Sequence, residues 1–192
     1  MTDQKIRCFI AVQLPSEVQN QISDYINKLK KCSTDVRWVQ AANIHLTLKF
    51  LGEIDSSRID LVKQSLYPIS NKFSSFHLNI SGSGCFPGKN RPRVFWLGMD
   101  QGEENSLFSS HQWIENQLAD INFEREKRRF SPHLTLGRVR SRESVDFSDL
   151  FTFLEQNPFT PKTFSVECIY FMQSFLKPTG AEYQIIEKYP LK

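Results

Sequence analysis

The sequence predicts an α+β fold, with helices packed on a largely antiparallel sheet. Stretches with the alternation of a strand outnumber stretches with the spacing of a helix. Several of these strands also follow one another through short turns instead of helices. Strands joined in this way pair antiparallel, whereas parallel pairing needs a long crossover at each join. A mixture of such hairpins with a few helices is typical of α+β proteins.

The chain begins with a predicted buried strand over residues 6–14, IRCFIAVQL, which is apolar and rich in β-branched and aromatic side chains. A helix over 16–31 follows, and Ser16 with Gln19 predicts a capping box at its start. Five apolar side chains recur at helical spacing and predict its buried face: Val18, Ile22, Tyr25, Ile26 and Leu29.

The other elements are predicted from the same periodicities. In the first half these are a short strand over residues 36–40, an alternating strand over 44–54 and a helix over 56–66 with its cap in 57–60. The middle predicts strands over 76–84 and 93–99 around a turn rich in Pro and Gly, and then a helix over 103–121. The last part predicts a strand over 130–140 and a helix over 144–157. Two strands over 163–176 and 181–189, joined by the turn KPTG, follow.

Composition and length set the broad class of the protein. The chain has 192 residues, of which 40% are hydrophobic and 23% charged, and a net charge of +3. This balance is typical of one sizeable globular domain, or of two small lobes that share a core. No apolar run is long enough to span a membrane, and the N-terminus lacks the pattern of a secretory signal. With four widely separated cysteines, we expect reduced thiols and a cytoplasmic protein.

The four letters HLTL occur twice, beginning at His45 and His133, and contain two of the four histidines. In a strand, residues i and i+2 share one face. Each copy should therefore present one imidazole and one hydroxyl together, those of His45 with Thr47 and those of His133 with Thr135. A regular strand would also place Lys49 on the face of His45, and Phe50 on the opposite face with Leu46 and Leu48.

Two imidazoles in one cleft can serve as a general base and a general acid, because histidine titrates near neutral pH. With two hydroxyls beside them, they suit attack of water on a phosphodiester. We expect no metal and no cofactor, since the chain has no HExxH, CxxC, phosphate-loop or dinucleotide motif. A Ser-His-Asp site is not predicted either, because the chain has no nucleophile elbow. The other histidines, His77 and His111, lack a threonine at i+2, and we expect structural roles for them.

Two H-x-T motifs 88 residues apart (133 − 45) resemble those of the two-histidine (2H) phosphoesterases. The most similar branch is the RNA 2',3'-cyclic phosphodiesterases, the LigT-like proteins also described as 2'-5' RNA ligases. The resemblance covers most of the chain and weakens after residue 141. Beyond the motifs it includes an opening strand, the lead-in to the first motif and the middle hairpin: RCFIAVQLP, RWVQAANIHLTLKFLGE and CFPGKNRPRVFWLGM.

The resemblance implies one bilobal phosphoesterase domain over residues 1–192, with two pseudo-twofold-related lobes around a central cleft. In it His45 would be the catalytic acid and His133 the base, while Thr47, Thr135 and Arg138 would bind phosphate. Arg138 is the fifth residue after His133, so a regular strand would place them on opposite faces. The implied role therefore requires a bulge in the strand, for which the glycine between Thr135 and Arg138 is suited.

The implied reaction opens the 2',3'-cyclic phosphate at an RNA 3' end and leaves a 2'-phosphate, with 2'-5' ligation as a related reaction. We expect a monomer that binds such RNA ends or cyclic nucleotides and no membrane. Candidate RNA contacts are Phe9, Lys49, Phe50, Arg91, Arg93 and Phe130. Each has a competing interpretation, because phenylalanines in apolar strands usually belong to the core and loop cations are usually solvated. Two other functions stay open: a phosphodiesterase of small cyclic nucleotides or 2'-5' oligoadenylate, and a non-catalytic RNA-binding module.

Overall fold

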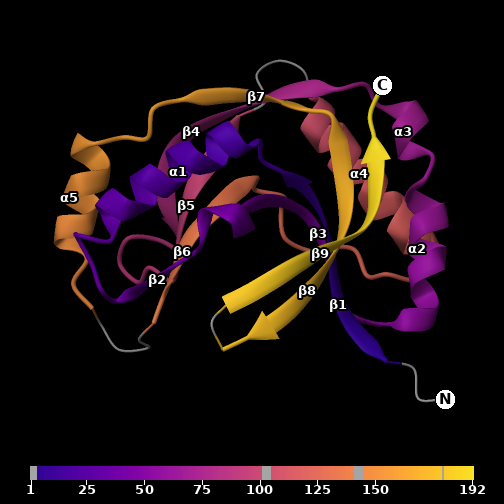
Figure 1. Ribbon diagram of the computed structural model, residues 1–192, viewed down its shortest axis with the longest axis horizontal. Coiled ribbons are helices and arrows are strands. Elements are labelled where there is room, and N and C mark those ends of the chain that lie inside the picture. Colours follow the sequence, from indigo (N-terminus) through magenta and orange to yellow (C-terminus); the bar gives the residue numbers. More distant parts are fainter. Residues whose placement is uncertain (1–3, 101–104, 141–144, 179) are drawn as a thin grey trace.

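A curled antiparallel sheet of nine strands forms the centre of the molecule (Figure 1). The computed structural model describes residues 4–100, 105–140, 145–178 and 180–192. The predicted α+β class is confirmed, since every strand pair in this sheet is antiparallel and helices flank the sheet. The starts of the helices predicted over 103–121 and 144–157, and residue 179 of the predicted turn, lie outside the described ranges. No described helix is both long and apolar enough to cross a bilayer.

The elements match the predicted ones to within a few residues at most ends. The strands are β1 (Lys5–Gln13), β2 (Val36–Trp38), β3 (His45–Asp55), β4 (Phe76–Phe86), β5 (Val94–Asp100), β6 (His133–Val139), β7 (Lys162–Val166), β8 (Cys168–Lys177) and β9 (Gly180–Pro190). The helices are α1 (Ser16–Leu29), α2 (Ile59–Leu66), α3 (Ile69–Lys72), α4 (Ser106–Asp120) and α5 (Ser148–Gln156), with 3-10 turns over Ala41–Asn43 and Ser56–Arg58.

The predicted strand over 163–176 is wrong, because this stretch forms two strands that lie far apart in the sheet. β7 pairs with β4 at one edge, whereas β8 lies between β1 and β9 near the other. The buried positions change parity at the break, from Phe164 and Val166 in β7 to Ile169 and Phe171 in β8. A single strand would turn one of these pairs out of the core, so the chain breaks at Glu167.

The predicted helix caps are also wrong, although the buried face of α1 is confirmed. Pro15 takes the N-cap position of α1, and no side chain caps it. The Gln19 amide instead donates to the Leu14 carbonyl, at 3.1 Å. The helix predicted to be capped within 57–60 begins at Ile59, with Arg58 at its N-cap. The five apolar positions predicted for α1 are its buried residues.

The two halves of the chain meet at the middle of the sheet. The strand order β7-β4-β5-β6-β3-β1-β8-β9 places the two HLTL strands side by side, with Leu46 opposite Leu134. The first leucines of the two copies therefore pair with each other, as a residue pair on a pseudo-twofold axis must. The outer partner of each copy is also equivalent, since β1 follows β3 on one side and β5 follows β6 on the other.

Helices from both halves combine to cover the sheet. In Figure 1, α1 and α5 lie at the left and α2 and α4 at the right. The Tyr25 hydroxyl of α1 donates to the Asn157 carbonyl at the end of α5, at 2.9 Å. The Ser65 hydroxyl of α2 donates to the Gln117 carbonyl of α4, at 3.0 Å. Each helical layer therefore joins a helix of the first half to one of the second, which ties the halves together.

Candidate active site

The junction of β3 and β6 carries a cleft of about 520 Å³ that holds both HLTL copies. Side chains from both halves of the chain line this cleft. They are Arg7, Phe9, Val39, Asn43, Ile44, His45, Thr47, Phe50, His133, Thr135, Arg138, Ser174, Leu176, Ala181 and Tyr183. The structure thus brings together the five residues for which a catalytic or phosphate-binding role was predicted.

A bulge in each HLTL strand decides which later residues reach the cleft. Along β1, Ala11 lies opposite Thr47 but Ile10 lies opposite Lys49, so Leu48 is an extra residue in β3. A bulge at this place shifts the side chains that follow it to the other face, up to the second register shift after Phe50. Lys49 therefore joins the core, and Phe50, opposite Phe9, joins the cleft.

The second copy has its bulge at the equivalent place. Along β5, Trp96 lies opposite Thr135 but Phe95 lies opposite Gly137, which leaves Leu136 as the extra residue in β6. Arg138 consequently lines the cleft, as the resemblance required. A Cβ atom on Gly137 would lie 2.5 Å from Val36 Cγ1 and 2.9 Å from Trp38 Cε3, both in β2. Only glycine leaves room for β2 to pair here.

Two predictions from a regular first strand are wrong for this reason. Lys49 does not share the face of His45: it is 6% exposed, and its ammonium lies 2.8 Å from a carboxylate oxygen of Glu115 in α4. Phe50 does not point into the core: it is 63% exposed. Because the bulge is a property of strand pairing, the alternation of the residues does not reveal it.

The two imidazole rings are held in the same way. Nδ1 of His45 lies 2.9 Å from the Asn43 carbonyl oxygen, and Nδ1 of His133 lies 2.7 Å from the Ser131 carbonyl oxygen. A carbonyl can only accept, so in each neutral ring the proton is on Nδ1. Nε2 of each ring is then left with a lone pair that can take a proton from a bound molecule.

The surroundings of the two rings differ. Phe9 stacks on His45 with 4.7 Å between ring centroids, and the Tyr183 ring meets it edge-on at 5.0 Å. Burial lowers the pKa of His45 to about 4, against the opposing effect of the Asn43 carbonyl. Near His133, the Phe86 ring lies edge-on at 5.0 Å. Burial therefore favours the neutral form of His45 at neutral pH.

The cleft side chains that sequence reasoning missed include Arg7 and Tyr183. Arg7 had a local signal, since it lies two residues before Phe9 in a predicted strand and shares its face. Tyr183, in β9, had none. Burial raises the pKa of the Tyr183 hydroxyl, while the positive charges of Arg138 and Arg7 act in the opposite direction. Both guanidinium groups therefore lie close enough to influence this hydroxyl.

The other candidate RNA contacts either lie away from the cleft or are buried beneath it. Phe130 does not line it, and stacks instead on His111 with 3.8 Å between centroids. Arg91 and Arg93 lie in the turn between β4 and β5, and neither lines the cleft. Phe9 does line it, but is only 2% exposed beneath His45 and offers little surface for stacking.

Comparison with known proteins gives the family. A family model described as LigT like Phosphoesterase matches residues 12–96 and 97–183, so each matched segment contains one HLTL copy. The chain belongs to the LigT-like phosphoesterase family. A relative from Thermotoga maritima named RNA 2',3'-cyclic phosphodiesterase is 35% identical over 94% of this chain and 93% of its own length. One from Archaeoglobus fulgidus with the same name is 29% identical over 93% and 97%.

Solved structures share this LigT-like fold. A protein from Thermus thermophilus superposes with a TM-score of 0.80 at 22% identity, over 97% of this chain and 98% of its own. E. coli LigT complexed with 3'-AMP superposes with a TM-score of 0.76 at 24% identity, over 98% and 99%. The predicted α+β class, with the two lobes that the resemblance implied, is therefore that of the family.

Proposed function

We propose that this LigT-like protein hydrolyses RNA 2',3'-cyclic phosphate ends to 2'-phosphate ends, with His45 and His133 as an acid–base pair. The observation that carries the proposal is the junction of β3 and β6, where two imidazoles from opposite halves line one cleft with their threonines. Relatives named RNA 2',3'-cyclic phosphodiesterase support the choice of substrate. We also propose that residues 1–192 act as one bilobal domain, because neither half holds the whole set of cleft residues.

The chemistry needs one proton to leave and one to arrive. His133 removes a proton from a water molecule, whose oxygen forms a new bond to phosphorus. The bond from phosphorus to O3' breaks, and His45 donates its proton to O3'. The product carries a 2'-phosphate and a free 3'-hydroxyl. Nε2 of each ring is the atom available for this exchange, because Nδ1 is held by a backbone carbonyl.

Negative charge grows on the non-bridging oxygens as water attacks. Thr47 and Thr135 offer one hydroxyl donor each from the two sides of the junction, and Arg138 offers a planar set of N–H donors with a fixed positive charge. No step in this scheme uses a metal ion. We therefore propose metal-independent hydrolysis, in which these donors stabilise the charge that a metal ion would otherwise balance.

A general acid must be protonated before it acts, yet burial favours the neutral form of His45. The bound phosphodiester resolves this conflict, since a negative charge beside the ring favours the imidazolium form. We infer that substrate binding is accompanied by uptake of a proton at His45. The same site would catalyse 2'-5' ligation if a 5'-hydroxyl replaced water, because the phosphate remains on O2' in both reactions.

Product analysis tests the proposal. An RNA with a 2',3'-cyclic end is incubated with the wild type, His45→Ala or His133→Ala, each with and without EDTA. We expect a 2'-phosphate from the wild type, unaffected by EDTA, and almost none from either variant. A 3'-phosphate product, or activity lost to EDTA and restored by zinc, would contradict it. If all three proteins bind the RNA and none cleaves it, the chain is a binding module.

A further inference from the structure

We propose that the exposed cations Lys127, Arg128 and Arg129 bind the phosphates of the RNA strand that leads into the cleft. The inference rests on the proposed function and specifies its substrate as an oligonucleotide instead of a mononucleotide. Because the cyclic phosphate is the 3' terminus of its strand, every other phosphate lies on the 5' side. These phosphates need a surface next to the cleft, and the segment between α4 and β6 supplies one.

This segment, residues 124–129, is exposed and mostly basic. It contains four cations and two carboxylates, EREKRR, for a formal charge of +2 (4 − 2). Three residues separate it from His133, so it leads directly into the second HLTL strand. In the part of the chain that the structure describes, no ion pair engages its four cations.

The basic segment adjoins the cleft at Phe50. A second hollow, of about 390 Å³, is lined by Lys49, Phe50 and residues 124–128. Phe50 also lines the main cleft, so the two hollows share this exposed ring. A strand that passes from one hollow to the other crosses an aromatic face, on which a base can stack with little regard to sequence.

A buried ion pair fixes the segment in this place. The Lys49 ammonium lies 2.8 and 2.9 Å from the two carboxylate oxygens of Glu115, and donates to the Glu124 carbonyl at 2.8 Å. The Glu126 backbone N–H donates to the same Glu115 carboxylate at 3.2 Å. The Lys49 and Glu115 side chains are only 4% and 9% exposed, so these contacts are shielded from water. They tie the segment to β3 and α4 together.

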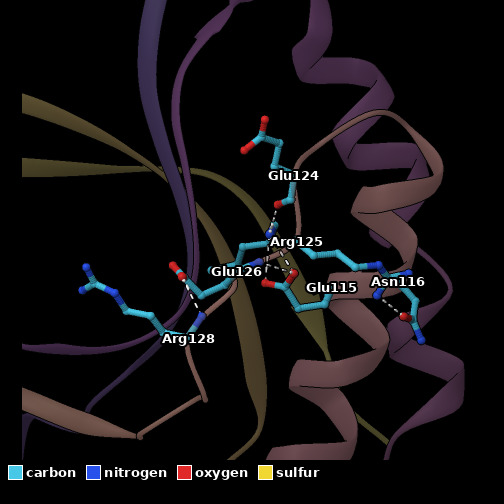
Figure 2. A network of polar contacts seen from close by, with 7 residues as sticks. Glu115, Asn116, Glu124, Arg125, Glu126 and Arg128 are labelled. Carbon is cyan, nitrogen blue, oxygen red and sulfur yellow. Dashed lines mark hydrogen bonds and ion pairs between the residues drawn. The ribbon is translucent and has the colours of Figure 1, made fainter.

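The same contacts leave the cations facing outward. Figure 2 shows Glu115 between α4 and the segment, and Arg128 extending away from the helix. The carboxylate of Glu126 accepts from the Arg128 backbone N–H at 3.1 Å. Arg125 bends back to the Asn116 side chain on α4. Lys127, Arg128 and Arg129 are therefore the cations best placed for RNA, held on an ordered backbone that requires little further ordering on binding.

The test compares two substrates in two variants, of which the second is the control. Lys127→Gln/Arg128→Gln/Arg129→Gln removes the three charges, and Lys28→Gln/Lys30→Gln/Lys31→Gln removes three exposed charges from the end of α1. Kinetics are measured for a ten-nucleotide RNA with a 2',3'-cyclic end and for a 2',3'-cyclic mononucleotide. We expect the first variant to raise KM for the RNA, so that its loss of kcat/KM exceeds the loss for the mononucleotide by at least ~10-fold.

Salt dependence and binding complete the test. Each single-strand phosphate contact contributes a slope of about 0.7 in a plot of log affinity against log salt, so the slope for RNA should fall by about 2. Equal losses for both substrates, an unchanged slope, or the same effect in the α1 variant would overturn the proposal. Affinity for a 2'-phosphate-ended RNA is measured as well. If that affinity falls in the first variant while the wild type cleaves no cyclic end, the proposed function fails and the RNA surface stands.

Discussion

The two halves of the sheet have the same backbone arrangement around the HLTL strands, but they differ in the residues that follow the bulge. In the first half these are Lys49 and Phe50, and in the second Gly137 and Arg138. The shared part gives each half one imidazole, one hydroxyl and one exchangeable nitrogen. In the first half, Phe50 gives an exposed aromatic ring and Lys49 a buried ion pair. In the second half, Arg138 gives a cation in the cleft and Gly137 leaves room for β2. We infer that the shared residues perform the chemistry and the differing ones divide the binding of base and phosphate.

The strongest way to break this comparison is to remove one imidazole at a time. If both halves contribute a proton-transfer group, His45→Ala and His133→Ala should each lower kcat by at least ~10²-fold. His77→Ala is the matched control, because His77 is exposed on β4 and does not line the cleft. Single-turnover rates on a cyclic-ended RNA measure the effect. A loss confined to one of the two variants would mean that the halves are not equivalent in the chemistry.

The glycine that distinguishes the second bulge gives a structural prediction. Gly137→Ala should destabilise the protein by about 1–3 kcal/mol, because the new methyl group would collide with Val36 and Trp38. Gly88→Ala should change stability far less, since an added Cβ there would meet no atom within 4 Å. Urea unfolding of the two variants compares them. If both have the wild-type midpoint, the close approach of β2 to β6 does not require a glycine.

The aromatic face of the first half should affect binding more than turnover. Phe50→Ala removes a stacking surface worth about 1–3 kcal/mol per base, which corresponds to a rise in KM of about 5- to 150-fold with little change in kcat. Phe50→Tyr keeps the ring and should retain the wild-type KM. Steady-state kinetics on a cyclic-ended RNA separate the two parameters. A fall in kcat with no change in KM would place the ring in the chemical step and not in binding.

The smallest expected effect concerns protonation of the first imidazole. Burial lowers the pKa of His45 to about 4, and a bound phosphate anion should raise it, because the negative charge stabilises the imidazolium. NMR titration of the ring with and without inorganic phosphate should show a rise of at least about one unit. By linkage, phosphate should then bind more tightly as the pH falls from the pKa of His45 in the complex toward its pKa in the free protein. An unchanged His45 titration would remove the argument for proton uptake.

The sequence by itself determined the elements that depend on local pattern. Alternation predicted the HLTL strands, helical spacing predicted the five buried side chains of α1, and the two H-x-T motifs indicated the family. These features can be predicted because each depends on the periodicity of one segment, where a strand or helix must turn its apolar face to the core. The resemblance also required a bulge between Thr135 and Arg138, where a regular strand would have turned Arg138 away from His133.

Tertiary structure decided where pairing overrides local pattern. The bulge at Leu48 exists only because β3 pairs with β1, and it exchanges the predicted positions of Lys49 and Phe50. Lys49 can be buried only because Glu115, 66 residues later, compensates its charge. The place of Tyr183 beside His45 and the contact of the basic segment with Phe50 likewise join distant parts of the chain. Register between strands and compensation of buried charge are properties of two segments together, and the pattern of one segment alone does not contain them.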